Sequence, residues 1–290
     1  MKPHIVIGTM RWGSWGRNLS SDQAAKLLKS CYDENLVKFD LADIYGDYTT
    51  ESLFGEALKK SGIKRNQLKI STKCGILYPG AHHRVKAYDS SKTHLINSVN
   101  NSLKNLNTDY LDVLFIHQQD HLMNFNELET VLTELKLSGK VKHFGVCNFS
   151  AYAFKVLYDK FPLVTNQMEF SLIKPGALFN DTLFQSGHYH KKTQIYTPLG
   201  NYFTAKNEAA YRLQNELTAT AKKYNATIDQ ILLAWTLKVP YKITPILGSV
   251  NIERIKEQIK AFDINLSVED WYKLLEISRG KPVGGTTQPR

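Results

Sequence analysis

Four side chains that can move or orient a proton follow apolar runs of the chain. Asp40 and Tyr45 lie in the segment FDLADIYG, Lys73 lies in STKCG, and His117 lies in LFIHQQD. Taken singly, each has an ordinary structural interpretation, such as a histidine whose hydrogen bonds are satisfied in the core. Taken together they favour chemistry, because core packing does not require ionisable groups and burying unpaired charge is costly.

The four residue types suit the addition of a proton and a hydride to a carbonyl group. A phenol has a pKa of about 10, and we expect the ammonium of Lys73 to lower the pKa of Tyr45 by favouring the phenolate. Asp40 would keep Lys73 charged, and His117 would orient the carbonyl oxygen towards Tyr45. No side chain can supply a hydride, so the arrangement implies a nicotinamide cofactor.

Polar residues that follow the later apolar runs suit this cofactor. The amides of Asn148 and Gln167 could bind the nicotinamide carboxamide, and the ring of Tyr196 could stack on the nicotinamide. Segment 248–251 is a small-residue loop before a helix, which is a ready anion site. Arg254 on that helix could bind an adenosine 2′-phosphate in bidentate fashion, although a solvated helix residue is an equally good interpretation. Neither GxGxxG after a strand nor GxxxxGK[ST] is present in the sequence.

These residues must be positioned by strands and helices that alternate along the chain. Apolar, β-branched runs, typical of strands buried on both faces of a parallel sheet, alternate with amphipathic stretches of helical period. About eight such units in 290 residues predict an α/β fold, a (β/α)8 TIM barrel, better than an open doubly wound sheet. The expected strands are 5–10, 37–41, 68–72, 111–116, 142–146, 163–166, 193–197 and 243–247, and the expected helices include 21–34, 91–105, 125–138, 151–160, 227–238 and 251–261.

Two further segments do not fit the simple alternation. Segment 201–225 predicts an extra helix after strand 7, and 268–278 predicts a C-terminal helix. A Gly/Pro-rich tail follows, which we expect to be loosely held from about residue 280. No linker or change of composition divides the chain, so residues 1–290 are predicted to form a single domain.

The composition limits the class of protein. No apolar run approaches the roughly 18 residues that cross a bilayer, and no signal peptide is evident. Cys31, Cys74 and Cys147 are widely spaced, as expected of free thiols in a reducing compartment. These features predict a cytoplasmic protein, with a monomer as the default and no membrane partner. The net charge of +10 comes from lysines scattered along predicted helix faces, which favours a solvated surface over a nucleic-acid stripe and suits a phosphorylated small molecule.

Over nearly its whole length the chain resembles the aldo-keto reductase family, and it is nearest the bacterial oxidoreductases of that family. FDLADIYG is similar to the family's FDTADxYG signature, GKVKHFGVCNFS to GKxRxxGVSNF, and TNQMEFS to NQxExS. The resemblance implies a (β/α)8 barrel, with Asp40, Tyr45, Lys73 and His117 as the catalytic residues. It also implies NADP(H), preferred over NAD(H), as the cofactor.

The resemblance further implies a set of cofactor-binding residues along the rim of the barrel. Position alone places Met10, Trp12, Tyr48 and the loop 77–86 at the substrate opening, where a small carbonyl compound would enter. The implied cofactor-binding residues are Thr9, Met10, Cys147, Asn148, Gln167, Tyr196, Thr197, Leu199, Gly248, Ser249, Asn251, Arg254, Glu257 and Gln258.

The sequence departs from the family pattern at three places. Cys147 stands where serine is usual, which weakens one hydrogen bond because a thiol is a poor donor. Gly248 stands where many NADP-preferring members have lysine, so the preference for NADPH depends mainly on Arg254. Gln118 and Gln119 replace the Arg-Pro that often follows the histidine.

The leading hypothesis is therefore the NADPH-dependent reduction of an aldehyde or ketone to an alcohol, with Tyr45 as general acid. One alternative is a regulatory or sensor subunit that holds the cofactor and turns over slowly. A less favoured one is a Schiff-base aldolase with Lys73 as nucleophile, since that chemistry needs a neutral amine and Asp40 would keep Lys73 protonated. No metal site is expected, because the histidine pairs His82–His83 and His188/His190 lack acid or thiol partners.

Overall fold

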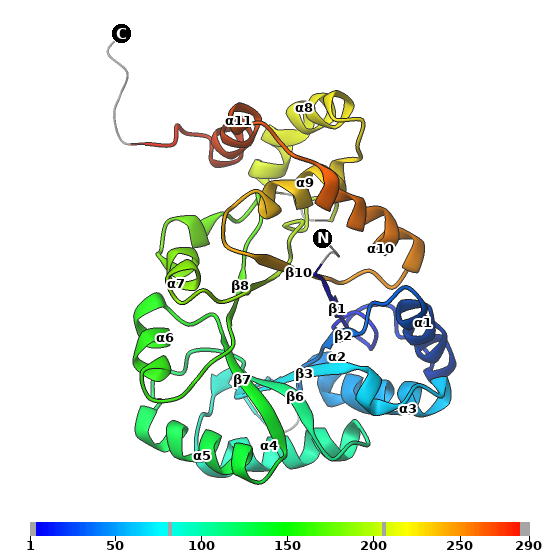
Figure 1. Cartoon of the computed structure of the whole chain (residues 1–290), viewed down its shortest axis with the longest axis vertical. Helices are drawn as coiled ribbons and strands as arrows, with labels where there is room; N and C mark the ends of the chain where they lie inside the picture. The colour runs from blue at the N-terminus through cyan, green and yellow to red at the C-terminus, as the bar shows by residue number, and fades with distance from the viewer. Residues whose placement is uncertain (1–3, 81–82, 205–206, 285–290) are drawn as a thin grey trace.

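A closed barrel of eight parallel strands forms the centre of the molecule, with helices around it (Figure 1). The computed structural model describes residues 4–80, 83–204 and 207–284. Around the barrel the strands follow the order β1-β10-β9-β8-β7-β6-β3-β2. The strands are β1 (Val6–Gly8), β2 (Lys38–Asp40), β3 (Lys69–Cys74), β6 (Leu111–Ile116), β7 (Val141–Cys147), β8 (Asn166–Glu169), β9 (Thr193–Tyr196) and β10 (Ile243–Leu247).

The barrel closes between its first and last strands. Val6 pairs with Ile246 and Ile7 with Leu247, in parallel register. At this junction a Cβ added to Gly8 would lie 2.9 Å from the Ile246 side chain, so the close approach of β1 and β10 requires a glycine. The predicted (β/α)8 fold is confirmed.

The helices connect successive strands and bury their apolar faces against the barrel. Most begin at a side-chain cap; in α1 the Ser20 hydroxyl accepts from the Gln23 N–H while Gln23 bonds back to the Ser20 N–H. The helices are α1 (Ser21–Asp33), α2 (Tyr45–Tyr48), α3 (Thr50–Ser61), α4 (Lys92–Asn105), α5 (Phe125–Leu137), α6 (Ala151–Tyr158), α7 (Thr182–His188), α8 (Glu208–Lys223), α9 (Ile228–Leu237), α10 (Ile252–Ile259) and α11 (Val268–Arg279).

One strand is displaced from its prediction. The apolar run suggested 163–166, whereas β8 runs over Asn166–Glu169. Two polar side chains fit inside this strand because their hydrogen bonds are made within the barrel: Asn166 bonds both backbone polar groups of Phe149, and Gln167 donates to Asp40. A prediction based on apolar runs places the end of such a strand too early. In the sequence, amide side chains suggest a loop, even where their hydrogen bonds are satisfied inside the protein.

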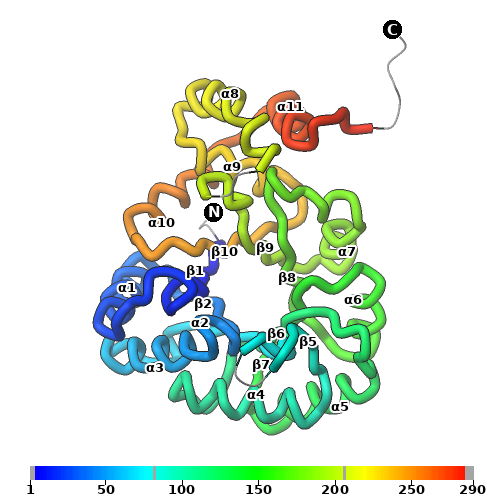
Figure 2. Tube along the Cα trace, turned by 180° about the vertical axis from the view of Figure 1, so that it is seen from behind, coloured from blue at the N-terminus to red at the C-terminus, as the bar shows by residue number. Residues whose placement is uncertain are grey.

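Three elements were not delimited from the sequence. Helices α3 and α7 follow β2 and β8, and a small antiparallel hairpin joins β4 (Ile76–Leu77) to β5 (Ala87–Tyr88). The hairpin projects from the end of β3 and forms part of the entrance described below. The trace in Figure 2 shows β5 close to the ends of β6 and β7.

The extra helix after strand 7 and the C-terminal helix are both present, as α8 and α11. They lie side by side beyond the barrel in both views (Figures 1 and 2). Helix α11 is fixed to α9 by the stacked rings of Trp235 and Trp271, whose centroids are 4.8 Å apart. Each indole N–H donates to the other residue's carbonyl, at 3.0 and 2.9 Å.

The chain beyond α11 remains in contact with that helix at Val283. The Val283 N–H donates to the Glu276 side chain at 3.0 Å. Residues 285–290 of the tail predicted to be loosely held lie outside the described residues. Among the residues that are described, no helix is long and apolar enough to cross a membrane.

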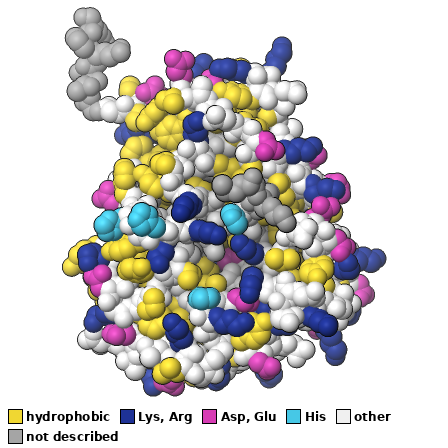
Figure 3. Space-filling model, in the orientation of Figure 1, with side chains coloured by type: hydrophobic (Ala, Val, Ile, Leu, Met, Phe, Trp, Pro, Cys, Tyr) yellow, Lys and Arg dark blue, Asp and Glu magenta, His cyan; other side chains and the backbone are white. Residues whose placement is uncertain are grey.

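Lysines lie along the helices, as expected, and five more lie at the N-terminal ends of the strands. Lys38 and Lys69 open β2 and β3, Lys142 is the second residue of β7, and Lys192 and Lys242 directly precede β9 and β10. Figure 3 shows several dark-blue side chains around the middle of this face. These five positive charges therefore lie at the end of the barrel opposite to the site described below.

A buried ion pair ties the N-terminal ends of β3 and β6 together. Asp112 accepts from the Arg65 guanidinium at 2.8 Å and from the Ile70 N–H at 3.0 Å, and its side chain is 6% exposed. Burial alone would raise the pKa of Asp112, but these hydrogen bonds and Arg65 lower it.

We expect Asp112→Asn to reduce the free energy of unfolding by about 3 kcal/mol, because it leaves Arg65 without its buried counter-ion. Urea denaturation measures the loss. As a control, Asp33→Asn removes a surface pair with Lys29 and should cost about 0.5 kcal/mol or less. Equal losses in the two variants would contradict the special role given to Asp112.

Candidate active site

A cavity of about 570 Å³ opens at the carboxyl ends of the barrel strands. This is the end at which (β/α)8 enzymes place their reacting groups, and the volume lies within the range of small-molecule sites. Each of the eight barrel strands contributes a lining residue at or just beyond its end: Gly8, Asp40, Lys73, His117, Cys147, Gln167, Tyr196 and Leu247.

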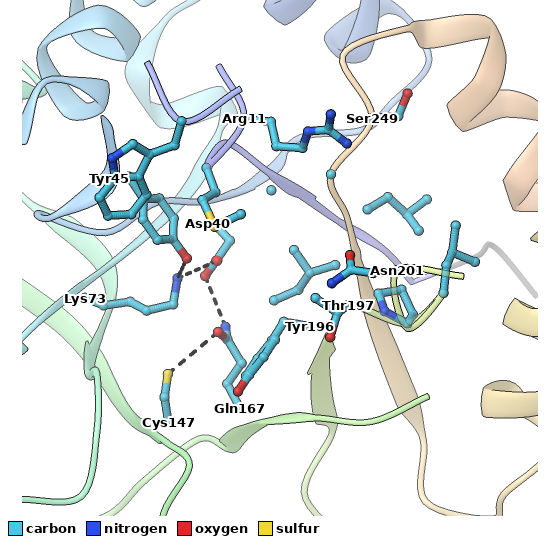
Figure 4. Close-up of a pocket in the computed structure, with 18 of the residues that line it drawn as sticks. Arg11, Asp40, Tyr45, Lys73, Cys147, Gln167, Tyr196, Thr197, Asn201 and Ser249 are labelled. Atoms are coloured by element: carbon cyan, nitrogen blue, oxygen red, sulfur yellow. Dashed lines mark hydrogen bonds and ion pairs between the residues drawn. The ribbon is translucent and has the colours of Figure 1, made fainter. Parts of the chain in front are cut away.

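Lys73 lies at the centre of the polar contacts in this cavity, with its side chain 1% exposed. Its ammonium donates to Asp40 at 2.5 Å, to the Leu41 carbonyl at 2.7 Å and to the Tyr45 oxygen at 3.1 Å (Figure 4). An ammonium has three hydrogens, so all of them are used. The Tyr45 oxygen accepts from Lys73, which leaves its own hydrogen free to be donated into the cavity.

Asp40 is held as a fully bonded carboxylate. Beyond Lys73, it accepts from the Ser71 hydroxyl at 3.2 Å and from the Gln167 amide at 3.1 Å. Burial is the largest single influence and would lower the pKa of Lys73, but the charge and hydrogen bond of Asp40, together with Tyr45 and Cys147, outweigh burial and raise that pKa. Lys73 is therefore a permanent cation at neutral pH.

The pKa of Tyr45 differs from the prediction. Burial raises it above its ordinary value, and Lys73 opposes that rise without reversing it. The phenol is therefore protonated at neutral pH, which is the form that a proton donor needs. The sequence-based prediction included the effect of the Lys73 ammonium. It could not include the loss of hydration of the buried phenol, which decides the direction in which the pKa of Tyr45 shifts.

The turn after Tyr45 has an uncommon backbone. Gly46, Asp47 and Tyr48 all have positive φ, at 58°, 55° and 65°. Side chains rarely adopt this conformation, and it is found where function fixes the backbone. The turn is stabilised by two hydrogen bonds: the Thr49 hydroxyl donates to the Gly46 carbonyl at 2.5 Å, and the Trp15 indole donates to Asp47 at 3.1 Å.

His117 lies opposite Tyr45, with ring centroids 6.1 Å apart and the rings edge to face. Its Nδ1 atom is buried and without a partner among the described residues. Burial, together with the positive charges of Lys73 and Lys86, lowers the pKa of His117 well below its ordinary value. The imidazole is therefore neutral and can act as a hydrogen-bond donor to an oxygen in the cavity.

The amides expected to bind a carboxamide lie side by side below the catalytic residues. Asn148 accepts from the Tyr196 hydroxyl at 2.9 Å. Gln167 donates to Asp40 and to Gln194, and its oxygen accepts from the Cys147 thiol at 3.6 Å. The Cys147 thiol thus bonds within the protein, to Gln167, and its expected weak hydrogen bond to a carboxamide stays a prediction.

The two glutamines that depart from the family pattern support these amides. Gln118 accepts from the Asn148 side chain at 3.1 Å, and Gln119 accepts from the Ser150 N–H at 3.0 Å. Asn148 has a positive φ of 57°, so its side chain is fixed both by this backbone and by Gln118 and Tyr196. Sequence reasoning had left the effect of the glutamines open.

The expected phosphate-binding residues lie at the opposite end of the cavity. Gly248, Ser249, Arg254 and Gln258 line it, and Figure 4 shows Ser249 on the loop after β10. The Arg254 side chain is half exposed, 4.0 Å from Asp229. Its guanidinium lies over the Phe203 ring, 5.7 Å from the centroid. Thr197, Leu199 and Met10 also line the cavity.

Three expected cofactor residues are absent from the cavity wall. Thr9 is fully buried and donates to the Asp40 carbonyl at 3.0 Å, so it positions β2. Asn251 caps α10 by accepting from the Arg254 N–H at 3.2 Å. The Glu257 carboxylate binds Lys260 at 2.7 Å. These side chains serve the scaffold around the site.

Of the two aromatic residues expected at the substrate opening, Trp12 was predicted wrongly. Trp12 has no exposed surface and packs on Phe54 and Phe39, with ring centroids 5.7 and 6.2 Å away. Tyr48 is exposed and does not line the cavity itself, but its hydroxyl accepts at 3.2 Å from the N–H of Tyr78, which does. The sequence does not distinguish an aromatic residue near a strand end that packs in the core from one that lines the opening of the cavity.

Sequence reasoning missed several residues that line the cavity, among them Arg11, Trp15, Asn201 and Phe203. Tyr78 and Lys86 also line it, within the loop 77–86 that had been expected there; residues 81–82 of that loop lie outside the described residues. These residues come from loops, so no strand-end pattern marks them. Among the described residues no group of three or more His, Cys, Asp or Glu could hold a metal ion.

Fold and site together define a (β/α)8 barrel with a buried tyrosine–lysine pair at one end of its cavity and a helix N-terminus at the other. Comparison with known proteins gives a more specific class. Residues 4–279 match the model of the Aldo/keto reductase family, and the chain belongs to that family. It is an NAD(P)H-dependent oxidoreductase.

Three known proteins illustrate the similarity. The oxidoreductase YcsN of Bacillus subtilis is 35% identical over 284 residues, covering 95% of this chain and 94% of that protein. The 6-dehydroglucose reductase of Agrobacterium fabrum is 34% identical over 285 residues, covering 96% and 95%. The crystal structure of an aldo/keto reductase from Klebsiella pneumoniae in complex with NADP and acetate has a TM-score of 0.78 at 24% identity, covering 99% and 94%, and shows the same fold.

The neutral state of His117 predicts a pH dependence of stability. The unfolded imidazole binds a proton below about pH 6.5, whereas the folded one resists it, so the free energy of unfolding falls as the pH drops from 7 to 5. The slope from this residue is at most about 1.4 kcal/mol per pH unit. Chemical denaturation across this range should show a shallower slope for His117→Asn, and the same slope as the unsubstituted protein for a variant of the exposed His143. A slope unaffected by His117→Asn would show that His117 titrates normally.

Proposed function

We propose that this protein reduces an aldehyde or ketone to an alcohol, with NADPH as the cofactor and Tyr45 as the proton donor. The observation that carries the proposal is the hydrogen bonding of Lys73: its three hydrogens are used by Asp40, Leu41 and Tyr45. The hydroxyl hydrogen of Tyr45 therefore faces the cavity. A buried, protonated phenol beside a fixed cation is suited to giving up a proton as negative charge develops on a neighbouring oxygen.

The residues along the cavity fit a nicotinamide dinucleotide. Asn148 and Gln167 offer amides for the carboxamide, Tyr196 offers a ring face, and Arg254 with the N-terminus of α10 offers positive charge for a phosphate. When bound, the cofactor supplies the hydride. The name of the relative from Agrobacterium fabrum, a reductase of a sugar carbonyl, agrees with this direction of reaction.

The protein's own part in the reaction is to orient the carbonyl and supply the proton. His117, as a neutral donor, holds the carbonyl oxygen towards Tyr45, and the Tyr45 hydroxyl hydrogen moves to that oxygen as the carbonyl carbon is reduced. Lys73 stabilises the phenolate that remains, and Asp40 keeps Lys73 charged and aimed. The proton on Tyr45 is then restored from water at the open end of the cavity.

Neither alternative gains support from the site. A Schiff-base aldolase needs a neutral lysine, whereas Asp40 raises the pKa of Lys73. A sensor subunit that holds the cofactor would not need a complete proton donor, and here Asp40, Tyr45, Lys73 and His117 are all present and in contact around one point.

Tyr45→Phe tests the proton donor. We expect kcat for aldehyde reduction to fall by a factor of about 100 or more, measured as loss of NADPH absorbance, because the ring stays in place and the transferable hydrogen is gone. NADPH binding, measured by fluorescence, should persist. Tyr211→Phe on the exposed surface of α8 is the matched control and should retain full activity. Turnover that survives in Tyr45→Phe would exclude this mechanism, and the absence of reduction of any aldehyde by the unsubstituted protein would favour the sensor alternative.

The choice between NADPH and NADH can be tested at Gly248. A Cβ at this position meets nothing within 4 Å, so Gly248→Lys adds a cation at the phosphate end without a clash. We expect it to raise the ratio of kcat/KM for NADPH over NADH by about tenfold, the worth of one charge-assisted contact, and Arg254→Ala to lower the ratio by a similar factor. Lys256→Ala, at an exposed position of the same helix paired with Glu253, should leave it unchanged. A ratio that does not move in Arg254→Ala would remove Arg254 from the cofactor site.

A further inference from the structure

The charges that line the cavity do not balance. Arg11, Lys73, Lys86 and Arg254 are cationic, whereas Asp40 is the one acidic residue among the described lining residues. Asp40 is paired with Lys73, so these two charges cancel. Three positive charges remain, which favours anionic ligands.

Two of the three remaining cations lie at the end of the cavity that suits the cofactor phosphates. Arg254 lies on α10, beside the loop after β10. Figure 4 shows the guanidinium of Arg11 directed across the cavity towards Ser249 on the same loop. A dinucleotide bound as proposed above carries its phosphates on this side, away from Tyr45. The cofactor therefore provides partners for Arg11 and Arg254.

Lys86 lies at the other end of the cavity. It directly precedes β5, whose hairpin partner β4 contributes Ile76 to the wall beside the catalytic residues. Its charge acts on His117, since it is one of the causes, after burial and Lys73, that lower the pKa of that imidazole. In the proposed binding mode the nicotinamide lies between the cofactor phosphates and Tyr45. The phosphates are then at the far end of the cavity and cannot pair with Lys86.

No side chain neutralises Lys86 either. It forms no ion pair with any of the described residues, although many other lysines do. Its one aromatic contact is with the Tyr88 ring, 5.8 Å from the centroid. A cation that lines a cavity near the reacting groups and lacks a partner is available to a ligand.

We propose that the carbonyl substrate carries a second, anionic group, a carboxylate or a phosphate, which Lys86 binds. The inference rests on the proposed function, because it places the substrate's anion at the end of the cavity that the bound cofactor would leave free. This anion is distinct from the oxygen being reduced, which faces Tyr45 and His117. Lysine would bind such a group through its ammonium, which is a compact and strongly hydrated point charge.

The wall beside the catalytic residues indicates what separates the two groups of the substrate. Trp15 and Tyr78 both line the cavity, with ring centroids 4.8 Å apart, and Ile44 and Ile76 complete an apolar surface. An aromatic ring or a short hydrocarbon chain between the carbonyl and the anion would bury against this surface. The substrate class is therefore an aldehyde or ketone with an apolar spacer and a terminal anion.

The experiment compares matched pairs of substrates that differ in one anionic group. The carboxylate pair is 4-carboxybenzaldehyde and methyl 4-formylbenzoate, and the phosphate pair is 4-formylphenyl phosphate and 4-hydroxybenzaldehyde. The measured quantity is the ratio of kcat/KM for the anion to that for its neutral partner, with saturating NADPH. We expect this ratio to fall by about threefold in Lys86→Met and further in Lys86→Glu, since an ionic contact made by an exposed lysine is worth about that factor.

Lys59→Met is the matched control, because Lys59 is an exposed lysine on α3, remote from the cavity lining. Its ratio should equal that of the unsubstituted protein. The pair whose ratio falls in Lys86→Met identifies the anion as carboxylate or phosphate. The preference should also weaken as salt is raised, because a partly exposed charge is screened. Ratios that are the same in Lys86→Met and the unsubstituted protein for both pairs would overturn the proposal.

A binding measurement keeps this inference separate from the proposed function. Calorimetry compares 4-(hydroxymethyl)benzoate with its methyl ester, each added to the protein loaded with NADP⁺. We expect the acid to bind more tightly than the ester, and Lys86→Met to remove the difference. If no aldehyde is reduced but this difference is seen, the proposed function fails and the anion site stands. If aldehydes are reduced and no difference is seen in binding or in the ratios, the anion site fails and the reductase stands.

Discussion

A charged lysine in the interior of the barrel is the constraint on which the site depends. Lys73 is almost completely buried, and a buried cation is tolerated only when it is paired and hydrogen-bonded. Asp40 supplies the pairing charge and is itself held by Ser71 and Gln167. Because Gln167 also bonds to Cys147, one hydrogen-bond network connects the Tyr45 hydroxyl with the Gln167 amide and the Cys147 thiol. The position of Tyr45 is therefore a consequence of how a single charge is satisfied.

Much of this organisation can be predicted from the sequence, where the physical signal is local. Apolar runs separated by amphipathic stretches predicted eight strands and most of the helices, and the polar residues at strand ends brought Asp40, Lys73 and His117 together correctly. The predictions failed where the outcome depends on what a side chain faces. Trp12 packs in the core because α3 covers it, and β8 contains amides whose partners lie elsewhere around the barrel, in a loop and on another strand. Arg11 and Trp15 went unnoticed because their loop approaches the cavity only in three dimensions.

The distribution of charge shows why the net value of +10 is a poor guide to function. Several lysines lie at the N-terminal ends of the strands, where Asp112 binds Arg65 and Lys69. The cavity at the opposite end holds only a few cations, but there the nearest acidic residue is already engaged. A small local imbalance next to reacting groups affects ligand binding more than a larger number of solvated charges, because screening weakens the latter.

The junction between β1 and β10 has a consequence for biosynthesis. The first strand remains an unpaired edge until residues 243–247 have been made, so more than two hundred residues separate the two partners along the chain. Contacts of such long range form late in folding. The same junction brings Gly8 beside Gly248, so the end of the cavity proposed to bind the nucleotide does not exist in a partly synthesised or partly opened barrel. Retention of a nicotinamide nucleotide would thus report that the chain is complete and closed, which gives a cell or an experimenter a direct measure of the fully folded fraction.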